Sequence, residues 1–324
     1  MKAIRLVTAA VAATAAAMAV VMVSAPQAKA DTAVLKAASF LPAKASFGWP
    51  FYKWVGNVNK ACLGKVRIDV LAPGSVKAFE QPNALKTGVI DMMSGPATYY
   101  KGTMVEGDTM VLSDMTIGEM RQSGALKMLN KLHNERLNAQ FLTYFGDGVP
   151  FHIYTTKEVK GGRFDGFTLR TAPIYDTMLQ ERGAKTVTMP PPAVYTALER
   201  GAVDGYGWPI WGIADFGWHK HTKYRVEPGF FKVEVGILIN LDRWKGMNDS
   251  QRACLNDMAS ELEKVWPSWR DAYTANEVKK QDDAGVKVIN LGAKFRQRAH
   301  DLYWAALEKA SPDNVRKLKK LLLK

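Results

Sequence analysis

The stretch from Gly166 to Pro209 decides the fold, and it reads GFTLRTAPIYDTMLQERGAKTVTMPPPAVYTALERGAVDGYGWP. Bulky and β-branched residues predict strands in it, and helical spacing and a run of prolines predict helices. Strands are predicted at 167–171, at 187–189 and from 203 onward, and the helices between them at 174–182 and 193–200. This alternation predicts parallel pairing of the three strands within one sheet.

Arg170 stands near the end of the first of these strands, and Trp208 follows the third. In a parallel sheet, ligands bind at the carboxyl ends of the strands. The arginine side chain offers a rigid fork of donors that matches two carboxylate oxygens. Because the stretch contains no histidine or cysteine, it favours holding a carboxylate over transforming it.

The residues before this stretch show the same alternation. Strands are predicted at 34–39, 65–71 and 89–94, with helices at 51–62 and 80–86 between them. A loop is then expected at 102–114, followed by one long amphipathic helix at 118–137. Further expected elements are strands at 140–145, 151–155, 224–226, 233–240 and 286–290 and helices at 249–280, 295–310 and 314–323.

The sequence therefore predicts an α/β fold with two lobes. Each lobe is expected to be a mostly parallel sheet flanked by helices, and the lobes are expected to be hinged by crossing strands and a long helix. Lobe I is predicted to comprise 31–150 plus 238–275, and lobe II 151–237 plus 276–324, with the C-terminal helices free to pack back on lobe I. Arg170 would face the other lobe, so closure would bury a bound solute and strengthen its ion pair.

The chain opens with a short positive region, Met1 to Arg5, followed by an Ala-rich apolar run and Ala28-Lys29-Ala30. This pattern is typical of a cleavable export signal, with cleavage expected after Ala30. A retained membrane anchor is the alternative interpretation of the apolar run. The formal net charge of +13 is spread along the sequence, which favours solubility and attraction of acidic solutes. Since an exported protein does not meet the genome, no nucleic-acid partner is expected.

The two cysteines, Cys62 and Cys254, fit no metal-binding spacing. Both fall on predicted helices, and an oxidising compartment would allow them to form one disulfide. The alternative is that each is a small buried apolar side chain.

The motifs of residues 166–209 resemble those of the DctP-like solute-binding proteins of TRAP transporters, which are bacterial periplasmic receptors. In that family a strand ending in arginine precedes a proline, and a segment of the type V-P-M-P is followed by Y-x-A-L and G-x-V-D-G. The matching segments here are 166–173, 187–190, 195–198 and 201–205, and 85–92 also resembles the family's helix-to-strand passage. The resemblance covers essentially the whole chain after residue 30 and implies the two-lobed periplasmic-binding-protein fold.

The resemblance places the family's solute-gripping arginine at Arg170; the alternative is a structural salt bridge. Relatives often carry Glu-Asn before the proline after V-D-G, whereas this chain carries Gly207 and Trp208. A tryptophan there is similar to the branch that binds 2-oxo acids, in which a preceding glutamate helps to hold a metal ion. Because that position is Gly207, no metal and no other cofactor is predicted.

Other residues are candidates for the wall of the site through their positions after strands or at helix starts. These candidates are Trp49, Glu80, Pro96, Tyr99, Phe151, His152, Ala193, Tyr195, Trp211 and Phe230. Plain core packing is the alternative for each aromatic side chain, a structural hydrogen bond for His152, and a solvated helix start for Glu80.

The resemblance implies a periplasmic receptor, not an enzyme, that delivers a small organic acid to the small and large membrane subunits of a TRAP transporter. The largely apolar wall favours a monocarboxylate with an apolar or aromatic body, or a 2-oxo acid. Two alternatives stay open: an exported enzyme that acts on a small carboxylic acid in the same cleft, and a binding protein that serves a sensor or an ATP-driven permease. The chain is expected to be a monomer or a homodimer.

Overall fold

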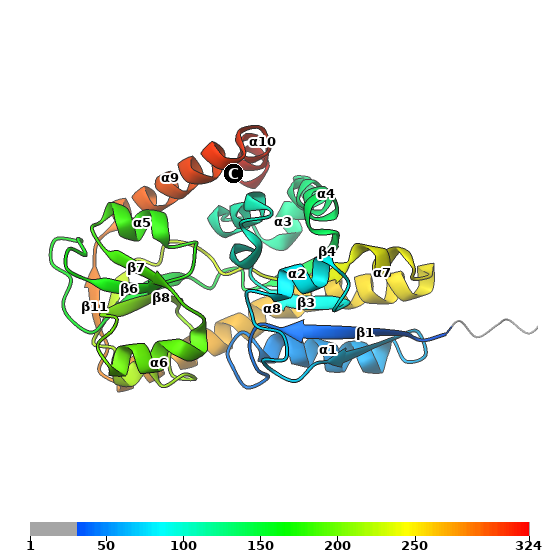
Figure 1. The fold of residues 1–324 in the computed structure, drawn as a ribbon, viewed down its shortest axis with the longest axis horizontal. Helices are drawn as coiled ribbons and strands as arrows, with labels where there is room; N and C mark the ends of the chain where they lie inside the picture. The colour runs from blue at the N-terminus through cyan, green and yellow to red at the C-terminus, as the bar shows by residue number, and fades with distance from the viewer. Residues whose placement is uncertain (1–30, 324) are drawn as a thin grey trace, which may run out of the picture. The chain divides into compact units, whose positions relative to one another are not determined.

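The computed structural model describes residues 31–323, and the predicted export signal lies outside these residues. Residues Thr32 to Lys324 form one compact unit, which contains two β-sheets (Figure 1). In the described residues no helix combines the length and apolarity that a membrane span requires.

The first sheet has five strands. Their spatial order is β2 (Val66–Val70), β1 (Ala33–Ser39), β3 (Met92–Gly95), β10 (Val235–Asn240) and β4 (Ala139–Phe145). Strand β1 pairs in parallel with both β2 and β3, as the alternation in the sequence predicts. Strand β10 is antiparallel to both of its neighbours, because the chain returns to this sheet from the second one.

The second sheet has six strands. Their order is β11 (Lys287–Asn290), β9 (Tyr224–Glu227), β5 (Phe151–Thr155), β8 (Gly205–Pro209), β6 (Thr168–Thr171) and β7 (Lys185–Thr188). Strand β6 pairs in parallel with β7 and with β8, which confirms the pairing predicted for residues 166–209. The ends of these parallel strands place Arg170 and Trp208 near each other, at the carboxyl edge.

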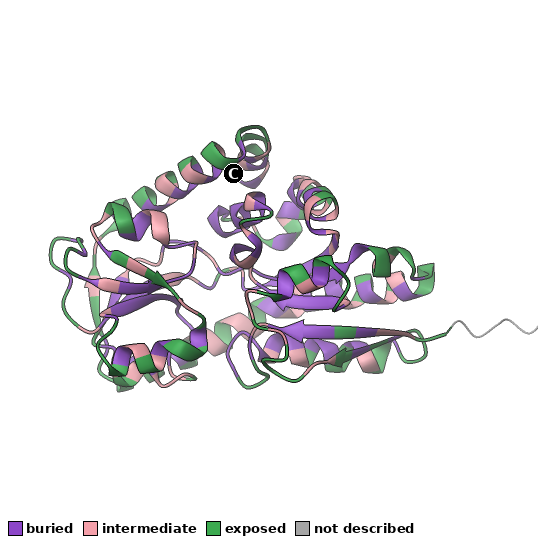
Figure 2. Cartoon of the chain, in the orientation of Figure 1, coloured by how far each residue is buried: buried purple, intermediate pink, exposed green. Residues whose placement is uncertain are grey.

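Helices cover both sheets, and their inward faces are buried whereas their outward faces are exposed (Figure 2). The first part of the chain contributes α1 (Trp49–Ala61), α2 (Gln81–Lys86), α3 (Ile117–Gln122) and α4 (Ala125–Leu137), with short 3-10 helices η1 (Ala97–Tyr100) and η2 (Val105–Leu112). The second sheet carries α5 (Asp176–Glu181), α6 (Pro191–Glu199) and the 3-10 helix η3 (Trp218–Lys220). The remaining helices are α7 (Leu241–Lys245), α8 (Asp249–Asp283), α9 (Ala293–Ala310) and α10 (Pro312–Leu322).

Two sequence-based expectations are wrong. The single helix expected at 118–137 is divided into α3 and α4, because Gly124 adopts a left-handed conformation with φ of +83°. The loop expected at 102–114 contains η2, in which all residues after Val105 are buried. Its acidic residues look solvent-exposed in the sequence, but Ser311, Asn314 and Arg136 bind the Glu106 carboxylate.

Three segments connect the two sheets: 146–150, 228–234 and the helix α8. The first two run side by side, since Pro150 forms an antiparallel bridge with Lys232 and the Val233 amide donates to the Val149 carbonyl. These connections position a cavity between the ends of the two sheets.

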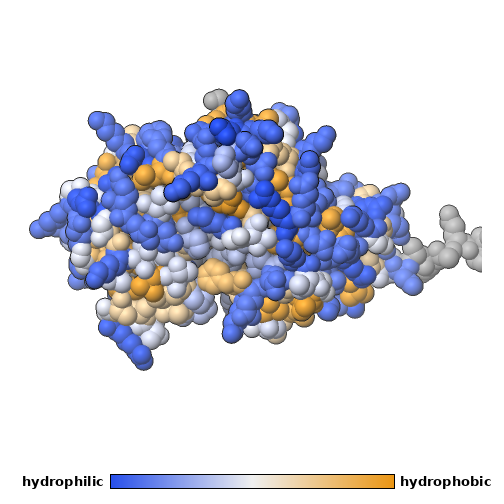
Figure 3. All heavy atoms as spheres, turned by 45° about the horizontal axis from the view of Figure 1, so that its top comes forward, coloured by the Kyte–Doolittle hydropathy of each residue, from blue (hydrophilic) through white to orange (hydrophobic). Residues whose placement is uncertain are grey.

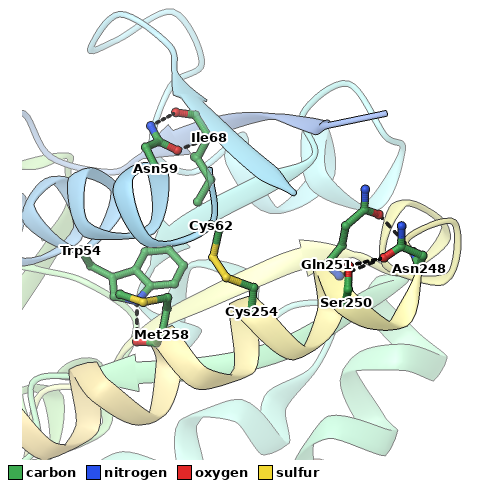
Figure 4. The surroundings of a disulfide bond; sticks show 9 residues. All are labelled: Trp54, Asn59, Cys62, Ile68, Asn248, Ser250, Gln251, Cys254 and Met258. Carbon is green, nitrogen blue, oxygen red and sulfur yellow. Dashed lines mark hydrogen bonds between the residues drawn. A yellow bond between two sulfur atoms is a disulfide. The ribbon is translucent and has the colours of Figure 1, made fainter. Parts of the chain in front are cut away.

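Helix α8 contacts residues of both sheets along its length. Its first half is tied to α1 by a disulfide between Cys62 and Cys254, whose Cα atoms are 6.0 Å apart (Figure 4). One turn further along, the Trp54 indole nitrogen donates to the Met258 carbonyl at 2.8 Å. Its second half reaches the segment after β8, where the Gln281 amide donates to the Ile210 carbonyl.

Candidate functional site

A cavity of about 50 Å³ lies where the two sheets approach each other. A single water needs only about 10–15 Å³ by the same kind of measure, so the cavity has room for several water-sized groups. The first sheet and its connections contribute Phe40, Phe47, Pro96, Thr98, Tyr99, Val233, Glu234 and Val235. The second sheet and its connections contribute Phe151, Arg170, Ala172, Ile174, Tyr175, Trp208 and Pro209.

Arg170 is the cationic residue of this lining, and its side chain is only 1% exposed. Its Nε donates to the Met189 carbonyl and its Nη1 to the Gly207 carbonyl, both at 3.0 Å. The centre of the guanidinium lies 5.3 Å from the ring centroid of Trp208. Two backbone carbonyls and one aromatic ring therefore fix the orientation of the side chain.

The remaining nitrogen of Arg170, Nη2, is buried without a hydrogen-bond partner in residues 31–323. No ion pair of Arg170 with a carboxylate occurs within the same residues, and burial lowers the pKa of its guanidinium. A buried charge without a counter-ion is costly, so an anion that enters the cavity would gain a strong partner there.

Four further polar atoms of the lining are buried without a partner in the described part of the chain. They are Thr98 Oγ1, Tyr175 OH, Trp208 Nε1 and Glu234 Oε1. Most buried polar atoms in proteins have a hydrogen-bond partner, so their accumulation around one cavity is unusual. A solute that carries oxygen atoms would satisfy several of them.

Gly207 leaves room for Tyr175, one of the residues that line the cavity. A Cβ atom at this position would lie 2.7 Å from the ring of Tyr175, closer than any real contact, so a side chain there would displace the tyrosine. The glycine therefore allows Tyr175 to lie against β8 while its own carbonyl holds Arg170. Within the described residues, no group of three or more His, Cys, Asp or Glu residues is placed to hold a metal ion.

The structure brings five of the sequence-predicted site residues together around the cavity. They are Arg170, Trp208, Pro96, Tyr99 and Phe151. Tyr99 lies between two other aromatic rings, with its centroid 4.3 Å from that of Phe79 and 5.8 Å from that of Phe40. Burial raises the pKa of Tyr99 to about 12, so its hydroxyl stays protonated at neutral pH.

The other predicted site residues do not line the cavity. Trp49 packs against Trp269 and Tyr273, and Trp211 is fully buried with its indole nitrogen bonded to Thr274. Glu80 is exposed at the rim of an outer groove, where it pairs with Lys77.

His152 is buried, and its Nδ1 lies 3.0 Å from the Val226 carbonyl; burial lowers the pKa of the imidazole. Phe230 belongs to an aromatic cluster with Phe231 and Phe295. On α6, Ala193 is exposed. Tyr195, on the same helix, packs against His221. These positions show that location after a strand does not by itself direct a side chain into the cavity.

Sequence reasoning missed several lining residues, above all Thr98, Tyr175 and Glu234. A signal for Glu234 does exist, because it is the single acid in the otherwise apolar segment Val233-Glu-Val-Gly-Ile-Leu-Ile239. Tyr175 offers no such signal, since its role depends on the missing side chain of a residue on another element.

Most of the visible surface is covered by hydrophilic residues, with smaller apolar patches between them (Figure 3). The described exposed large apolar side chains are few and come from separate elements: Leu63, Val89, Val187, Val288 and Leu323.

Comparison with known proteins gives a consistent result. A model of bacterial extracellular solute-binding protein family 7 matches residues 51–311. A monocarboxylate 2-oxoacid-binding periplasmic protein of Nostoc sp. is 20% identical over 269 residues, which cover 79% of this chain and 74% of that protein.

Solved structures of similar fold include a TRAP periplasmic solute-binding protein from Desulfovibrio salexigens with bound orotic acid. Its TM-score against this chain is 0.79 and its sequence identity is 18%, and the match covers 90% of this chain and 97% of that one. A TRAP solute-binding protein from a marine metagenome, in complex with 3-hydroxybenzoate, has a TM-score of 0.74 and 21% identity over 90% of this chain and 98% of that one. These structures show the two-lobed fold of TRAP periplasmic binding proteins for this chain.

Proposed function

The chain belongs to bacterial extracellular solute-binding protein family 7, and from this premise we propose that it is the periplasmic receptor of a TRAP-type transporter. In this proposal it captures a small organic acid between its two sheets and holds the carboxylate with Arg170. It then delivers the solute to the membrane subunits of the transporter.

The unpartnered Nη2 of Arg170 is the observation that carries this proposal. Nε and Nη1 are occupied by backbone carbonyls, so the guanidinium is oriented before any solute arrives. A carboxylate placed beside Nη2 would supply the missing charge and a charge-assisted hydrogen bond. Because the guanidinium is buried, this pair would be stronger than one at the surface.

The rest of the lining suggests what the solute looks like. Aromatic and aliphatic side chains such as Phe47, Phe151, Ile174 and Trp208 form most of the wall. This favours a monocarboxylate with an apolar or aromatic body, or a 2-oxo acid. The relative from Nostoc is described as binding 2-oxo acids, and the metagenome protein binds 3-hydroxybenzoate.

We favour binding over catalysis because, among residues 31–323, the lining contains a single carboxyl group, that of Glu234, and no histidine, cysteine or lysine. A nucleophile with a neighbouring base, or an acid with a base, is therefore not assembled around Arg170. An exported enzyme with the same cleft is the competing function. Formation of product from candidate acids incubated with the purified protein would support that alternative.

The proposal includes location and partners. Residues 1–30 would direct export and be removed after Ala30, and the mature receptor would work in the periplasm as a monomer or a homodimer. A binding protein that serves a sensor or an ATP-driven permease is the other alternative. Co-purification with the small and large membrane subunits of a TRAP transporter would distinguish the two.

Thermal denaturation of the mature chain, residues 31–324, in the presence of a panel of organic acids tests the proposal. A solute that binds the folded state raises the melting temperature by mass action. We expect Arg170→Met, which keeps the apolar stem of the side chain but removes its donors, to abolish the rise.

Arg67→Met is the matched control, because Arg67 is a half-exposed residue of the edge strand β2 that pairs with Asp69 and does not line the cavity. This control should respond to the acid as the wild type does. An unchanged rise in Arg170→Met, or no rise with any monocarboxylate or 2-oxo acid in the wild type, would contradict the proposal. Circular dichroism of the unliganded variants checks that both are folded.

A further inference from the structure

Glu234 lines the same cavity as Arg170. It stands at the end of the crossing segment 228–234, directly before β10 of the first sheet, whereas Arg170 belongs to β6 of the second. The side chain is buried, with 2% exposed. Its Oε2 accepts a hydrogen bond of 2.8 Å from the Ala97 amide, and this bond fixes the carboxyl group.

The other oxygen of Glu234, Oε1, has no partner among the described residues. No lysine, arginine or histidine within residues 31–323 forms an ion pair with this carboxyl group. An ionised carboxylate in such a place would be a buried charge without a counter-ion, so the group retains its proton instead. Because Oε2 accepts from Ala97, the proton is held on Oε1.

The electrostatic surroundings agree with a neutral side chain. Burial raises the pKa of Glu234 to about 8, and the carboxylate of Asp108 adds to the rise, while the Ala97 amide opposes it. At neutral pH the Oε1–H group of this lining residue is thus a hydrogen-bond donor without a partner among residues 31–323. Thr98 Oγ1, which also lines the cavity without a partner, stands one residue after Ala97.

We propose, on the basis of the function proposed above, that Glu234 is a specificity-determining residue that donates a hydrogen bond from Oε1 to an uncharged oxygen of the solute. The preferred solute is then a monocarboxylate that carries a hydroxyl or carbonyl oxygen in addition to its carboxylate. Arg170 holds the charged end from one sheet, and Glu234 selects the second oxygen from the other.

This arrangement discriminates against two other classes of acid. An acid without the second oxygen leaves the buried Oε1–H donor without a protein or solute partner, and a site built to bond a hydroxyl rejects such analogues strongly. A dicarboxylate brings a second negative charge to a place that offers no second cation in the lining. Both classes should bind more weakly than a hydroxy- or oxo-monocarboxylate of the same size.

Isothermal titration calorimetry of the mature protein with matched pairs of acids tests the inference. Suitable pairs are benzoate with 3-hydroxybenzoate, phenylacetate with 3-hydroxyphenylacetate, and butyrate with 2-oxobutyrate. We expect the member with the extra oxygen to bind at least about tenfold more tightly in one pair or more. This comparison uses the wild type alone, so it does not depend on the folding of any variant.

Two variants then assign the preference to residue 234. Glu234→Gln keeps a donor and an acceptor in place of the carboxyl group and should retain the preference. Glu234→Leu removes the donor and should reduce the preference to about threefold or less, mainly by weakening the acid with the extra oxygen. Glu135→Leu, at an exposed position of α4, is the control and should behave as the wild type.

The possible results separate the two proposals. Binding of acids with equal affinity within every pair would overturn the role of Glu234 and leave the receptor function intact. A preference that survives in Glu234→Leu would also overturn it. Failure of every acid to bind would overturn the receptor function, and the inference with it. Tighter binding of an amino acid than of its 2-oxo analogue would show that Glu234 is an ionised partner of ammonium, which contradicts a donor role.

Discussion

Arg170 and Glu234 are both buried and ionisable, but the guanidinium of Arg170 carries a charge whereas the carboxyl group of Glu234 is neutral in our inference. The guanidinium is always charged in proteins, so Arg170 keeps its cation even in a buried site, and in our proposal an incoming anion compensates this charge. The carboxyl group can shed its charge by holding a proton, so Glu234 needs no counter-ion. In our inference the cavity thus contains a permanent cation and a neutral hydrogen-bond donor. Together they favour a solute with one carboxylate and one uncharged oxygen.

The protonation of Glu234 predicts a pH dependence of stability. The folded state holds the proton up to about pH 8, whereas the unfolded chain releases it near the ordinary value of 4.5. Between these values the folded state binds more protons, so the free energy of unfolding falls as pH rises, by at most about 1.4 kcal/mol per pH unit from this group. Above about pH 8 this contribution is lost.

Urea denaturation of the wild type and Glu234→Gln between pH 4.5 and 8.5 measures this effect. The stability of the wild type relative to the variant should decline as pH rises, since glutamine does not titrate. Neighbouring groups that interact with Glu234, namely Asp108, Tyr100 and Tyr144, are present in both proteins, so their own titration largely cancels in the difference. A difference that stays constant across this range would show that Glu234 is ionised in the folded protein.

At the scale of elements, α8 links the parts of the molecule. Its first half packs on α1, and there the Glu263 carboxylate accepts hydrogen bonds from Thr143 and Arg121. Its second half contacts the segment after β8, where Glu277 accepts from the Gly212 amide and Gln281 donates to the Ile210 carbonyl. A capping box between Asn248 and Gln251 satisfies donors at its beginning (Figure 4). A helix held at both ends in this way fixes how far the two sheets can separate.

Removal of the disulfide should destabilise the chain at this element. Cys62 and Cys254 are separated by 192 residues, so the bond closes a long loop in the unfolded chain. The double variant Cys62→Ser/Cys254→Ser should lose about 2–5 kcal/mol of unfolding free energy. Urea denaturation measures the loss, and incubation of the wild type with a reducing agent should reproduce most of it.

Neither Cys62 nor Cys254 is among the residues that line the cavity. The double variant should therefore keep its acid preference at temperatures where it is folded. A loss of less than about 0.5 kcal/mol would mean that the helix contacts alone hold α8 on α1.

At the scale of the whole molecule, solute capture depends on two sheets that share one cavity and three connections. The segments 146–150 and 228–234 run beside each other, and the second of them carries Glu234 to the cavity. Helices α9 and α10 add a further link, since α9 contacts α5 and η2, and α10 contacts η2 and α4 (Figure 1). Rotation about the two crossing segments is the motion through which a solute would enter and leave.

Small-angle X-ray scattering of the mature protein tests this motion. A bound acid that contacts both sheets stabilises the closed arrangement, so the radius of gyration should fall when the acid is added to saturation. Arg170→Met should show no change at the same acid concentration, because it lacks the contact to the carboxylate. An identical radius for the free and the saturated wild type would indicate that the sheets do not move apart in solution.

The sequence alone determined the alternation of strands and helices, the parallel pairing within residues 166–209 and the placement of Arg170 and Trp208 at one sheet edge. These features follow from local residue patterns and from the chain order, which restricts how a sheet can be connected. The sequence did not predict the division of the helix at Gly124 or the buried helix η2. The first depends on one residue's backbone conformation, and the second on partners roughly two hundred residues away.

Only the tertiary structure decided which side chains surround the cavity. Trp49, Trp211 and Phe230 are aromatic like much of the wall but pack elsewhere, whereas Tyr175 and Glu234 reach the cavity from positions outside the segments that match the family's motifs. The direction of a side chain depends on the register of its strand and on its neighbours from distant parts of the chain, and the pKa of Glu234 depends on burial. Both arise from packing, which a local pattern of residues does not encode.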